Sequence, residues 1–357
     1  MAPIPTYDDS VNNNNECETK VFPYKIINVR EDINKELLEV FTGEKSGFLQ
    51  VGPKKWFFPS GYKREAEHLY NFVARPTDVF IVTFPRSGTT WTQELVWLLA
   101  NDLDYETANK VLLAQRFPFL EFSCFVHKEV KANLLKVNQF DPPSCKLIET
   151  LDYPSWKYLD TIKENRFIKT HLPFSLLPSN LLNAGSKVIY VARHPKDVAV
   201  SYYHLNRTYV TQGYVGDFKN FWKYFQSGLV AWGPYWEHLK EGWSRRHEKN
   251  VLFYFYEDMK KNPIATFRKL ATFLGKNYSD EELSILENHL RIDNFKNNKS
   301  VNNDEHRNIG LIANGEESFI RKGVIGGWTT YFDENLSQEA DRWIEDNLRS
   351  SNIVLPY

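Results

Sequence analysis

The sequence predicts an α/β fold: a single domain in which a central parallel sheet is flanked by helices. From about residue 70 to residue 260, runs of β-branched and aromatic residues alternate with amphipathic helical patterns, the order that βαβ units require. The runs are continuously apolar, which is typical of strands buried on both faces. The sequence has no internal repeat and no linker between domains. We therefore expect one folded domain over residues 21–357, preceded by a flexible polar tail at residues 1–20.

Four strands are expected in order along the chain. The first is followed by a glycine-containing turn and by a helix from Thr89 to about Asn101, whose apolar residues recur at helical spacing. Pro195 suits the first turn of a helix that continues through His204. A last amphipathic helix is expected near residues 336–348. The predicted strands are residues 78–84, 166–171, 187–193 and 251–256.

Charge and composition limit the partners. The chain has 44 Lys plus Arg and 45 Asp plus Glu, a formal net charge of −1, so its bulk charge offers no attraction to nucleic acid or to an anionic membrane. An anionic ligand must therefore be bound by a few well-placed cations. Aromatic residues make up 15% of the chain. They fill either a large core or a pocket for a flat apolar ligand.

Cysteine usage and the N-terminal segment indicate a cytosolic protein. The three cysteines, Cys17, Cys124 and Cys145, are odd in number and lack metal-ligand spacing, which argues against a disulfide framework and for a reducing compartment. The N-terminal segment has neither the basic start nor the apolar core of a secretory signal, and no apolar run reaches the roughly 18 residues of a membrane span. We expect no membrane partner and no nucleic-acid partner.

The segment Thr83–Trp91, TFPRSGTTW, is the strongest candidate for a binding site. A strand, a tight turn and the start of a helix direct free backbone N–H groups and the helix dipole at one point. Arg86 adds a charge, and Ser87, Thr89 and Thr90 add hydroxyl groups. An ordinary helix N-cap made by Ser87 or Thr89 is the alternative. Because the residue order differs from that of a Walker A loop, the segment predicts a site for a phosphate-like anion rather than ATP hydrolysis.

Lys169 and His171 end a predicted strand and share one face of it, since residues two apart on a strand point the same way. Ligands of open α/β sheets lie beyond the carboxyl ends of the strands, so we expect this pair beside the anion loop. Histidine can act as a general base near neutral pH, and lysine can neutralise charge on a transferring group. A single histidine is more often structural than catalytic, but its place beside Lys169 and the loop favours catalysis.

Two further segments offer cations. Arg193 ends a predicted strand, and Ser201 lies two turns into the following helix. In the glycine-rich segment FIRKG, Arg321, Lys322 and Gly323 can surround an oxyanion with a guanidinium fork and an exposed backbone N–H. Each of these groups, taken alone, is more often a solvated surface residue. Composition does not assign the two segments to one ligand.

Several motifs together resemble the cytosolic sulfotransferases, and they occur in the family's order over about residues 45–350. They are TFPRSGTTW at 83–91, KTHLP around His171, VARHPKDVAVSYYH from 191, FYEDMKKNP from 255 and FIRKGVIGGW from 319. The RSGTT loop, NFKNNKSVN from 294, YFDENL from 331 and a long span before KTH are similar to the insect branch of the family, which includes retinol dehydratase.

The resemblance implies a sulfuryl donor, 3′-phosphoadenosine 5′-phosphosulfate (PAPS), a product adenosine 3′,5′-bisphosphate (PAP), a P-loop-like phosphosulfate-binding loop, and no metal. It implies that His171 takes the acceptor proton and that Lys169 stabilises the sulfuryl oxygens, with Arg86 and Ser201 also at the reaction centre. By motif position, the 5′-phosphosulfate would be bound by Arg86, Ser87, Gly88, Thr89 and Thr90, the adenine by Trp91, Tyr256 and Phe295, and the 3′-phosphate by Arg193, Ser201, Arg321, Lys322 and Gly323.

The chain departs from the family pattern in three places. Arg86 stands where most relatives carry lysine, and the two residues are not interchangeable. Asp293 and Asn294 replace the usual Thr-Ser before Phe295. The family's short dimer motif is absent after Trp328, so a homodimer formed by that route is not implied.

Phe119 and Phe122, in the segment RFPFLEF, match the family's aromatic gate around a flat acceptor. With His171 and Lys169 they would bind the acceptor, and the aromatic excess then favours an apolar pocket. The long span at about residues 123–165 is either a lid that excludes water or a surface excursion packed on itself. The sequence thus predicts a cytosolic sulfotransferase acting on a hydroxyl of a small apolar or phenolic molecule. The alternatives are an enzyme similar to retinol dehydratase, which dehydrates an allylic alcohol through a sulfated intermediate, and a nucleotide-binding relative without turnover.

Overall fold

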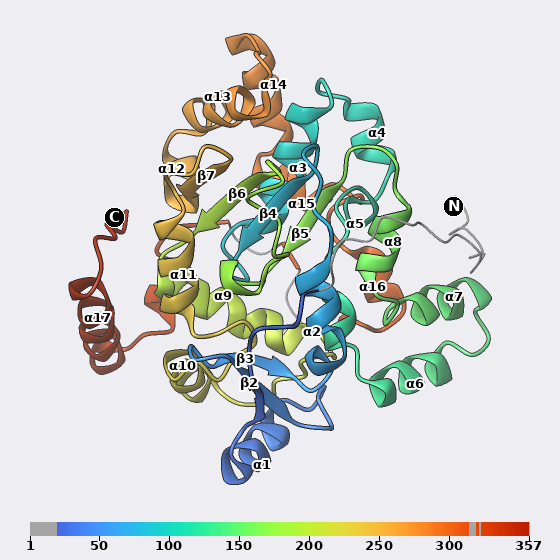
Figure 1. Cartoon of the computed structure of the whole chain (residues 1–357), viewed down its shortest axis with the longest axis vertical. Coiled ribbons are helices and arrows are strands. Elements are labelled where there is room, and N and C mark those ends of the chain that lie inside the picture. Colours follow the sequence, from blue (N-terminus) through green and yellow to red (C-terminus); the bar gives the residue numbers. More distant parts are fainter. Residues whose placement is uncertain (1–19, 314–318, 321–322, 357) are drawn as a thin grey trace.

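The computed structural model describes residues 20–313, 319–320 and 323–356. Four parallel strands form one sheet in the order β5–β4–β6–β7, surrounded by helices (Figure 1). The predicted α/β fold is confirmed, and each strand lies inside its predicted range: β4 is Val79–Thr83, β5 Phe167–Thr170, β6 Lys187–Ala192 and β7 Val251–Phe255. Of the predicted tail at residues 1–20, only Lys20 lies within the described residues.

The predicted helices also form. The helix after β4 is α3 (Thr89–Ala100), the helix after β6 is α9 (Pro195–Thr208), and the C-terminal helix is α17 (Glu334–Arg349). Each helix within the described residues is too short or too polar to cross a lipid bilayer. The other helices are α1 Glu31–Val40, α2 Tyr62–Asn71, α4 Tyr105–Lys110, α5 Leu113–Arg116, α6 Lys128–Val137, α7 Pro142–Thr150, α8 Ser155–Thr161, α10 Phe218–Gln226, α11 Tyr235–Ser244, α12 Tyr256–Lys261, α13 Pro263–Leu274, α14 Asp280–His289, α15 Ile292–Asn297 and α16 Asp304–Asn308, with 3-10 turns at Phe122–Phe125, Phe174–Leu176 and Gly327–Thr330.

The two faces of the parallel sheet are covered by two separate hydrophobic clusters. Val79 and Ile81 of β4 pack in a cluster with apolar residues of α3 and α13. Phe80 and Val82 belong to the other cluster, with residues of α9 and α11. Because side chains alternate across a strand, a strand covered on both faces must be apolar at every position. This requirement explains why the strand runs were visible in the sequence.

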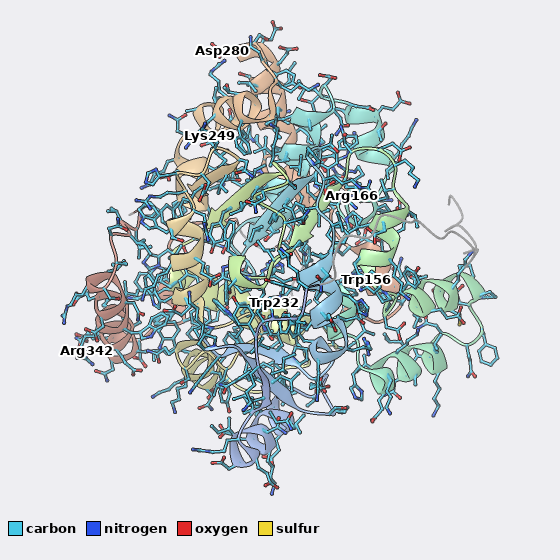
Figure 2. All side chains as sticks on the ribbon, viewed as in Figure 1. Trp156, Arg166, Trp232, Lys249, Asp280 and Arg342 are labelled. Atoms are coloured by element: carbon cyan, nitrogen blue, oxygen red, sulfur yellow. The ribbon has the colours of Figure 1, made fainter. Side chains whose placement is uncertain are left out.

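A second sheet, which was not predicted from the sequence, precedes the parallel one. It is antiparallel, in the order β1–β2–β3, with β1 at Ile26–Asn28, β2 at Phe48–Val51 and β3 at Trp56–Pro59. Backbone hydrogen bonds of 2.9 Å join Phe57 of β3 to both Trp232 and Gly233. The small sheet thereby supports the loop that carries Trp232, which lies near the middle of the molecule, whereas Asp280 and Arg342 lie at its periphery (Figure 2).

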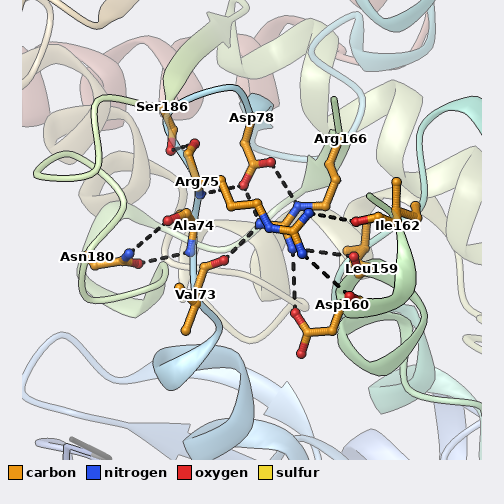
Figure 3. Close-up of polar contacts among 10 residues, drawn as sticks. All are labelled: Val73, Ala74, Arg75, Asp78, Leu159, Asp160, Ile162, Arg166, Asn180 and Ser186. Carbon is orange, nitrogen blue, oxygen red and sulfur yellow. Dashed lines mark hydrogen bonds and ion pairs between the residues drawn. The ribbon is translucent and has the colours of Figure 1, made fainter. Parts of the chain in front are cut away.

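The span 123–165 contains α6, α7 and α8, and its C-terminal end is fixed to the sheet. The guanidinium of Arg166 donates to Asp78 Oδ1 at 2.8 Å and to Oδ2 at 2.6 Å, with both side chains fully buried (Figure 3). It also donates to the carbonyl oxygen of Leu159 at the end of α8, at 3.3 Å. A cation at a helix C-terminus is favourable. The end of the span is therefore held firmly at the start of β4 and β5.

Candidate active site

The loop between β4 and α3 contains two residues in the left-handed region. Arg86 has a φ of 69° and Gly88 a φ of 97°. A Cβ atom at Gly88 would lie 2.6 Å from Cδ2 of Tyr256, which is closer than real contacts allow. The position therefore requires glycine both for its conformation and for its space. The turn leads directly into α3, whose first N–H groups have no acceptor within the helix.

Ser87 and the start of α3 together form an anion-binding geometry. Ser87 is fully buried, and its Oγ has no hydrogen-bond partner within the described residues. A buried hydroxyl group without a partner is costly unless a ligand supplies one. The hydroxyl groups of Thr89 and Thr83 are hydrogen-bonded, 2.8 Å apart, and Thr90 follows Thr89 on the first turn of α3. The Ser87 hydroxyl, the free N–H groups and the positive helix end fit the oxygens of a phosphate-type group.

The predicted cations Arg86 and Arg193 come from different elements and meet at this loop. Arg86 Nε donates to Ser201 Oγ at 2.9 Å, and Nη2 donates to the carbonyl oxygen of Phe319 at 3.1 Å. Arg193 Nη1 donates to the carbonyl oxygen of Arg86 at 3.1 Å. The Nε of Arg193 is buried and has no hydrogen-bond partner among the described residues. The residue after β6, the middle of α9 and the anion loop thus meet at one cationic site.

Two of the predicted 3′-phosphate residues, Arg321 and Lys322, lie outside the described residues. Gly323 is described and has a φ of 61°, a conformation that favours glycine. The segment that follows is attached to the cationic site, because Arg193 Nη2 donates to the carbonyl oxygen of Val324 at 3.0 Å.

Trp91 and Tyr256 lie beside the loop, as predicted for a base-binding pocket. Their rings meet edge to face with centroids 5.7 Å apart, and the Arg193 guanidinium lies 4.5 Å from the centroid of the Tyr256 ring. Trp91 is half-buried and offers surface to a ligand. Phe295 is only 3% exposed and lies in the same hydrophobic cluster as Tyr256. It therefore supports the pocket from within.

His171 is buried and held in one tautomer. Its Nδ1 lies 2.9 Å from the carbonyl oxygen of Thr83 and 3.0 Å from the hydroxyl oxygen of the same residue, which can donate its own proton to the hydroxyl of Thr89, 2.8 Å away. Because a carbonyl oxygen only accepts, Nδ1 carries the proton, and Nε2 is the nitrogen able to accept one. Burial, together with the charge of Lys169, lowers the pKa of His171 well below its usual value. The imidazole is therefore neutral at pH 7, the form that a general base needs.

Lys169 lies on the same strand end as His171, at the predicted place. Its Nζ lies 4.1 Å from the centroid of the Phe119 ring, a cation–π contact. Burial lowers the pKa of Lys169 to about 8, with a smaller opposing effect of the Glu121 carboxylate. Lys169 is therefore mostly charged at pH 7, and its charge acts on the pKa of His171.

The structure places a carboxylate, Glu121, behind this pair, and the sequence analysis did not single it out. Glu121 is fully buried; its Oε1 accepts from the backbone N–H of His171 at 2.7 Å and from Trp232 Nε1 at 3.0 Å. Its Oε2 accepts from the hydroxyl of Thr170 at 2.8 Å. Burial raises the pKa of Glu121 to about 7. The carboxylate fixes the strand end that carries both Lys169 and His171.

The aromatic residues Phe119 and Phe122 lie next to the histidine. The centroid of the Phe119 ring is 5.1 Å from that of His171 and 5.8 Å from that of Phe122. Trp232 stacks on Phe119 with centroids 6.1 Å apart. Both phenylalanines are half-buried. This aromatic wall fits a flat apolar molecule placed beside Nε2 of His171.

In the part of the chain that the structure describes, no group of three or more His, Cys, Asp or Glu side chains is arranged to hold a metal ion. The positive charge of the site comes from Arg86, Lys169 and Arg193. Chemically, the arrangement can bind a phosphate-type anion and take a proton from a neutral molecule that lies on the aromatic wall.

The chain is similar to several known proteins. Residues 76–352 match the model of the sulfotransferase domain family. The luciferin sulfotransferase of Photinus pyralis is 34% identical over 331 residues, which cover 91% of this chain and 85% of that protein. The sulfotransferase 1A1 of Mus musculus is 35% identical over 280 residues, covering 77% of this chain and 86% of that protein.

Solved structures of retinol dehydratase are also similar. The complex with androsterone and the inactive cofactor PAP has a TM-score of 0.87 and 38% sequence identity, covering 94% of this chain and 98% of that chain. The complex with retinol and PAP has a TM-score of 0.86 at the same identity, covering 94% of this chain and 99% of that chain.

Proposed function

This chain belongs to the sulfotransferase family and takes its sulfuryl group from PAPS, and from that premise we propose that it transfers the group to a hydroxyl of a small apolar or phenolic molecule, with His171 as the general base. The observation that carries the proposal is the 2.9 Å contact between His171 Nδ1 and the carbonyl oxygen of Thr83. It leaves Nε2 as a proton acceptor beside the aromatic wall and the Lys169 ammonium group.

The donor site follows from the residues around the loop. When bound, PAPS supplies an activated sulfuryl group. We assign its 5′-phosphosulfate to the loop and the start of α3, its adenine to the Trp91 side, and its 3′-phosphate to the cationic site that includes Arg193. The unpartnered Oγ of Ser87 and Nε of Arg193 support this assignment, because each is a buried donor that a phosphate oxygen would satisfy. The assigned residues are Arg86, Ser87, Gly88, Thr89, Thr90, Trp91, Arg193, Ser201, Tyr256, Phe295 and Gly323.

Catalysis would rest on fixed charges and one base. His171 Nε2 accepts the proton of the acceptor hydroxyl as the oxygen becomes a nucleophile. Lys169 neutralises the negative charge on the transferring group, and its place 4.1 Å from the Phe119 ring keeps the ammonium group beside the acceptor. Arg86 and Ser201, joined at 2.9 Å, stabilise charge at the phosphate side. The hydrogen bonds and ring contacts described above hold these side chains in place before the substrate binds, so the site needs little reorganisation during the transfer.

The acceptor class follows from the aromatic wall. The half-buried rings of Phe119 and Phe122 lie next to His171, and the buried Trp232 stacks on Phe119. Flat or apolar acceptors gain hydrophobic and ring contacts in such a pocket. Relatives support this class: one is named for luciferin, and the retinol dehydratase structures contain retinol or androsterone.

The span 123–165 is proposed as a lid over the acceptor pocket. Val130 and Leu134 of α6 and Ile148 of α7 pack in one cluster with Ile309, and the partly buried Phe122 packs against that cluster. Asn138, at the end of α6, donates to the carbonyl oxygen of Ile309 at 3.0 Å. A pair of helices attached to the gate residue on one side and to α16 on the other would exclude water from the transfer.

A dehydratase is the second candidate, favoured by the TM-score of 0.87 to retinol dehydratase. In that case an allylic alcohol would be sulfated, and the C–O bond to the sulfate would then break as a proton leaves the carbon chain and a new double bond forms. Both candidates use the same donor site and the same base. They differ only in the fate of the sulfated product.

The deciding experiment mixes purified protein with PAPS and a panel of phenols, catechols, steroids and retinol, and follows PAP release and product mass. A product heavier by one sulfuryl group supports the transferase, and a product lighter by one water supports the dehydratase. Binding of PAPS without PAP release across the panel would overturn both and leave a nucleotide-binding protein.

The free thiols of Cys124 and Cys145 support a cytosolic location for this reaction, because a reducing compartment keeps such thiols unpaired.

A further inference from the structure

We propose that His306 determines acceptor specificity by donating a hydrogen bond to a second oxygen of the acceptor, at the end of the aromatic wall away from His171. The inference rests on the proposed function, since it names a second contact within the same acceptor site. The acceptor class becomes narrower: an apolar or aromatic molecule with one hydroxyl for transfer and a carbonyl, ether or hydroxyl oxygen farther along its length.

His306 lies on α16 and packs against Phe122 of the proposed acceptor site. Its ring is parallel to that of Phe122, with an interplanar angle of 4° and centroids 6.3 Å apart. Phe122 is in turn 5.8 Å from Phe119, whose ring is 5.1 Å from that of His171. The order His171, Phe119, Phe122, His306 places the two gate phenylalanines between two histidines. A molecule lying along those rings would have an imidazole near each end.

The protonation of His306 follows from its neighbours. Asn303 Nδ2 donates to the hydroxyl oxygen of Tyr209 at 3.1 Å, and the same hydroxyl lies 3.3 Å from Nδ1 of His306. Among the described residues, that Nδ1 is the one acceptor for the proton of the buried Tyr209 hydroxyl. The hydroxyl therefore donates to Nδ1, and the neutral ring carries its proton on Nε2.

The free nitrogen of His306 is a donor for which the structure shows no partner. Nε2 makes no hydrogen bond within the described part of the chain, and the residue is half-buried rather than enclosed. Burial, and then the nearby charge of Lys169, lower the pKa of His306 to about 4, so the ring is neutral at pH 7. The influence of Lys169 also indicates that His306 lies on the side of the reacting centre.

The two histidines are thus held in opposite tautomers. A carbonyl oxygen holds the proton of His171 on Nδ1, which leaves Nε2 as a base. A hydroxyl donor holds the proton of His306 on Nε2, which leaves that nitrogen as a hydrogen-bond donor. A single pocket therefore offers an acceptor of protons at one end and a donor to oxygen at the other. An elongated molecule with one hydroxyl and one further oxygen matches both.

The backbone holds His306 in place. Its carbonyl oxygen accepts from the N–H groups of Leu311 and Ile312 at 2.9 and 3.2 Å. Asn303, directly before α16, has a φ of 58° and fixes the direction in which the helix begins. The backbone of His306 is fixed by these contacts, and its ring is fixed by Tyr209 and Phe122. The side chain therefore loses little conformational freedom on binding, which makes its hydrogen bond selective.

The test compares two acceptors that differ in one oxygen, using the full-length enzyme and His306→Phe. Phenylalanine keeps the ring beside Phe122 and removes the N–H donor. Suitable pairs are 2-naphthol with 6-acetyl-2-naphthol, and androsterone with the same steroid lacking the ketone. We expect the variant to lower kcat/KM for the acceptor with the second oxygen by about five- to tenfold, the size of one neutral hydrogen bond. For the acceptor that lacks this oxygen, kcat/KM should change by less than about twofold.

Tyr209→Phe is the second variant, because it removes the hydroxyl that sets the tautomer while leaving His306 intact. Tyr209→Phe should also lower the ratio of kcat/KM between the two acceptors of a pair, but by a smaller factor than His306→Phe. Equal changes for both members of a pair in both variants would overturn the role of His306 while leaving the transferase reaction intact. Failure of the unaltered enzyme to sulfate any member of either pair would instead overturn the proposed function, and this inference with it.

Discussion

Arg86 donates through Nε to Ser201 Oγ at 2.9 Å, and the same guanidinium reaches the carbonyl oxygen of Phe319 at 3.1 Å. One side chain therefore joins the anion loop, α9 and the segment that leads to the predicted 3′-phosphate residues. A lysine at this position has one nitrogen on a flexible stem and could not hold both partners in a fixed geometry. The arginine is thus a structural link as well as a charge.

Arg86→Lys should keep the positive charge and release the link to Phe319. We expect the affinity for PAP to fall about three- to tenfold, because one charge-assisted hydrogen bond that orders the segment is lost. Isothermal calorimetry with PAP measures this change. Arg245→Lys, on the exposed surface, is the matched control. Equal affinities of Arg86→Lys and the unaltered protein would show that the Phe319 contact does not order the donor site.

His171→Ala should abolish transfer and preserve donor binding, because the histidine acts on the acceptor proton. We expect kcat to fall about a hundredfold to ten-thousandfold, the usual contribution of a general base, while PAP affinity changes less than about twofold. Turnover assays and calorimetry measure the two effects separately. His247→Ala, on the exposed surface, controls for the loss of an imidazole. Near-normal turnover in His171→Ala would rule out the assignment of the base.

Arg193→Ala should weaken nucleotide binding. Its Nε is a buried donor without a partner in the described residues, and we expect it to contact a phosphate oxygen. Loss of a hydrogen bond to a charged group should lower PAP affinity about tenfold to a hundredfold. The comparison of PAP with adenosine 5′-monophosphate separates the 3′-phosphate from the rest of the nucleotide. An equal loss for both nucleotides would place Arg193 elsewhere than at the 3′-phosphate.

The value of kcat/KM for PAPS should fall at alkaline pH. The pKa of Lys169 is lowered to about 8 by burial, so its ammonium form, which transfer requires, is present below that pH and is lost above it. The neutral form of His171 persists to well below pH 6.5, because burial lowers its pKa. We therefore expect kcat/KM for PAPS to be level near neutral pH and to fall above about 8, where Lys169 loses its proton.

Lys169→Arg is the control for that profile. A guanidinium stays charged throughout the range, so the alkaline fall should disappear even if the rate is lower. In kcat, measured with PAPS bound, the fall should move to higher pH, because a nearby anion stabilises the ammonium form. A fall at the same pH in both the native enzyme and Lys169→Arg would assign it to another group.

Gly88→Ala should damage both stability and donor binding. The added methyl group would lie 2.6 Å from the Tyr256 ring at a φ of 97°, and such strain costs about 1–3 kcal/mol of unfolding free energy. Thermal unfolding and PAP calorimetry measure the two effects. Gly275→Ala is the matched control, because Gly275 has a φ of 80° and no atom within 4 Å of the added methyl group. It should lower stability less and leave PAP affinity unchanged.

Much of the fold could be predicted because its signals are local. A strand covered on both faces is apolar at every position, so β4, β6 and β7 were visible as runs. The antiparallel sheet, whose strands have three or four residues each, was missed. Their pairing depends on contacts between segments rather than on the pattern within each one.

The site divides in the same way. By itself the sequence determined the strand–loop–helix of the anion site, the shared strand face of Lys169 and His171, and the cations at Arg86 and Arg193, because each depends on residues close together in the chain. Only the tertiary structure shows the surroundings of Glu121 and His306, from which we infer their roles. The hydrogen-bond partners of these two side chains lie between 49 and 111 residues away in the sequence. Burial and hydrogen-bond geometry, which fix the tautomer and pKa of a side chain, exist only once those distant segments have packed together.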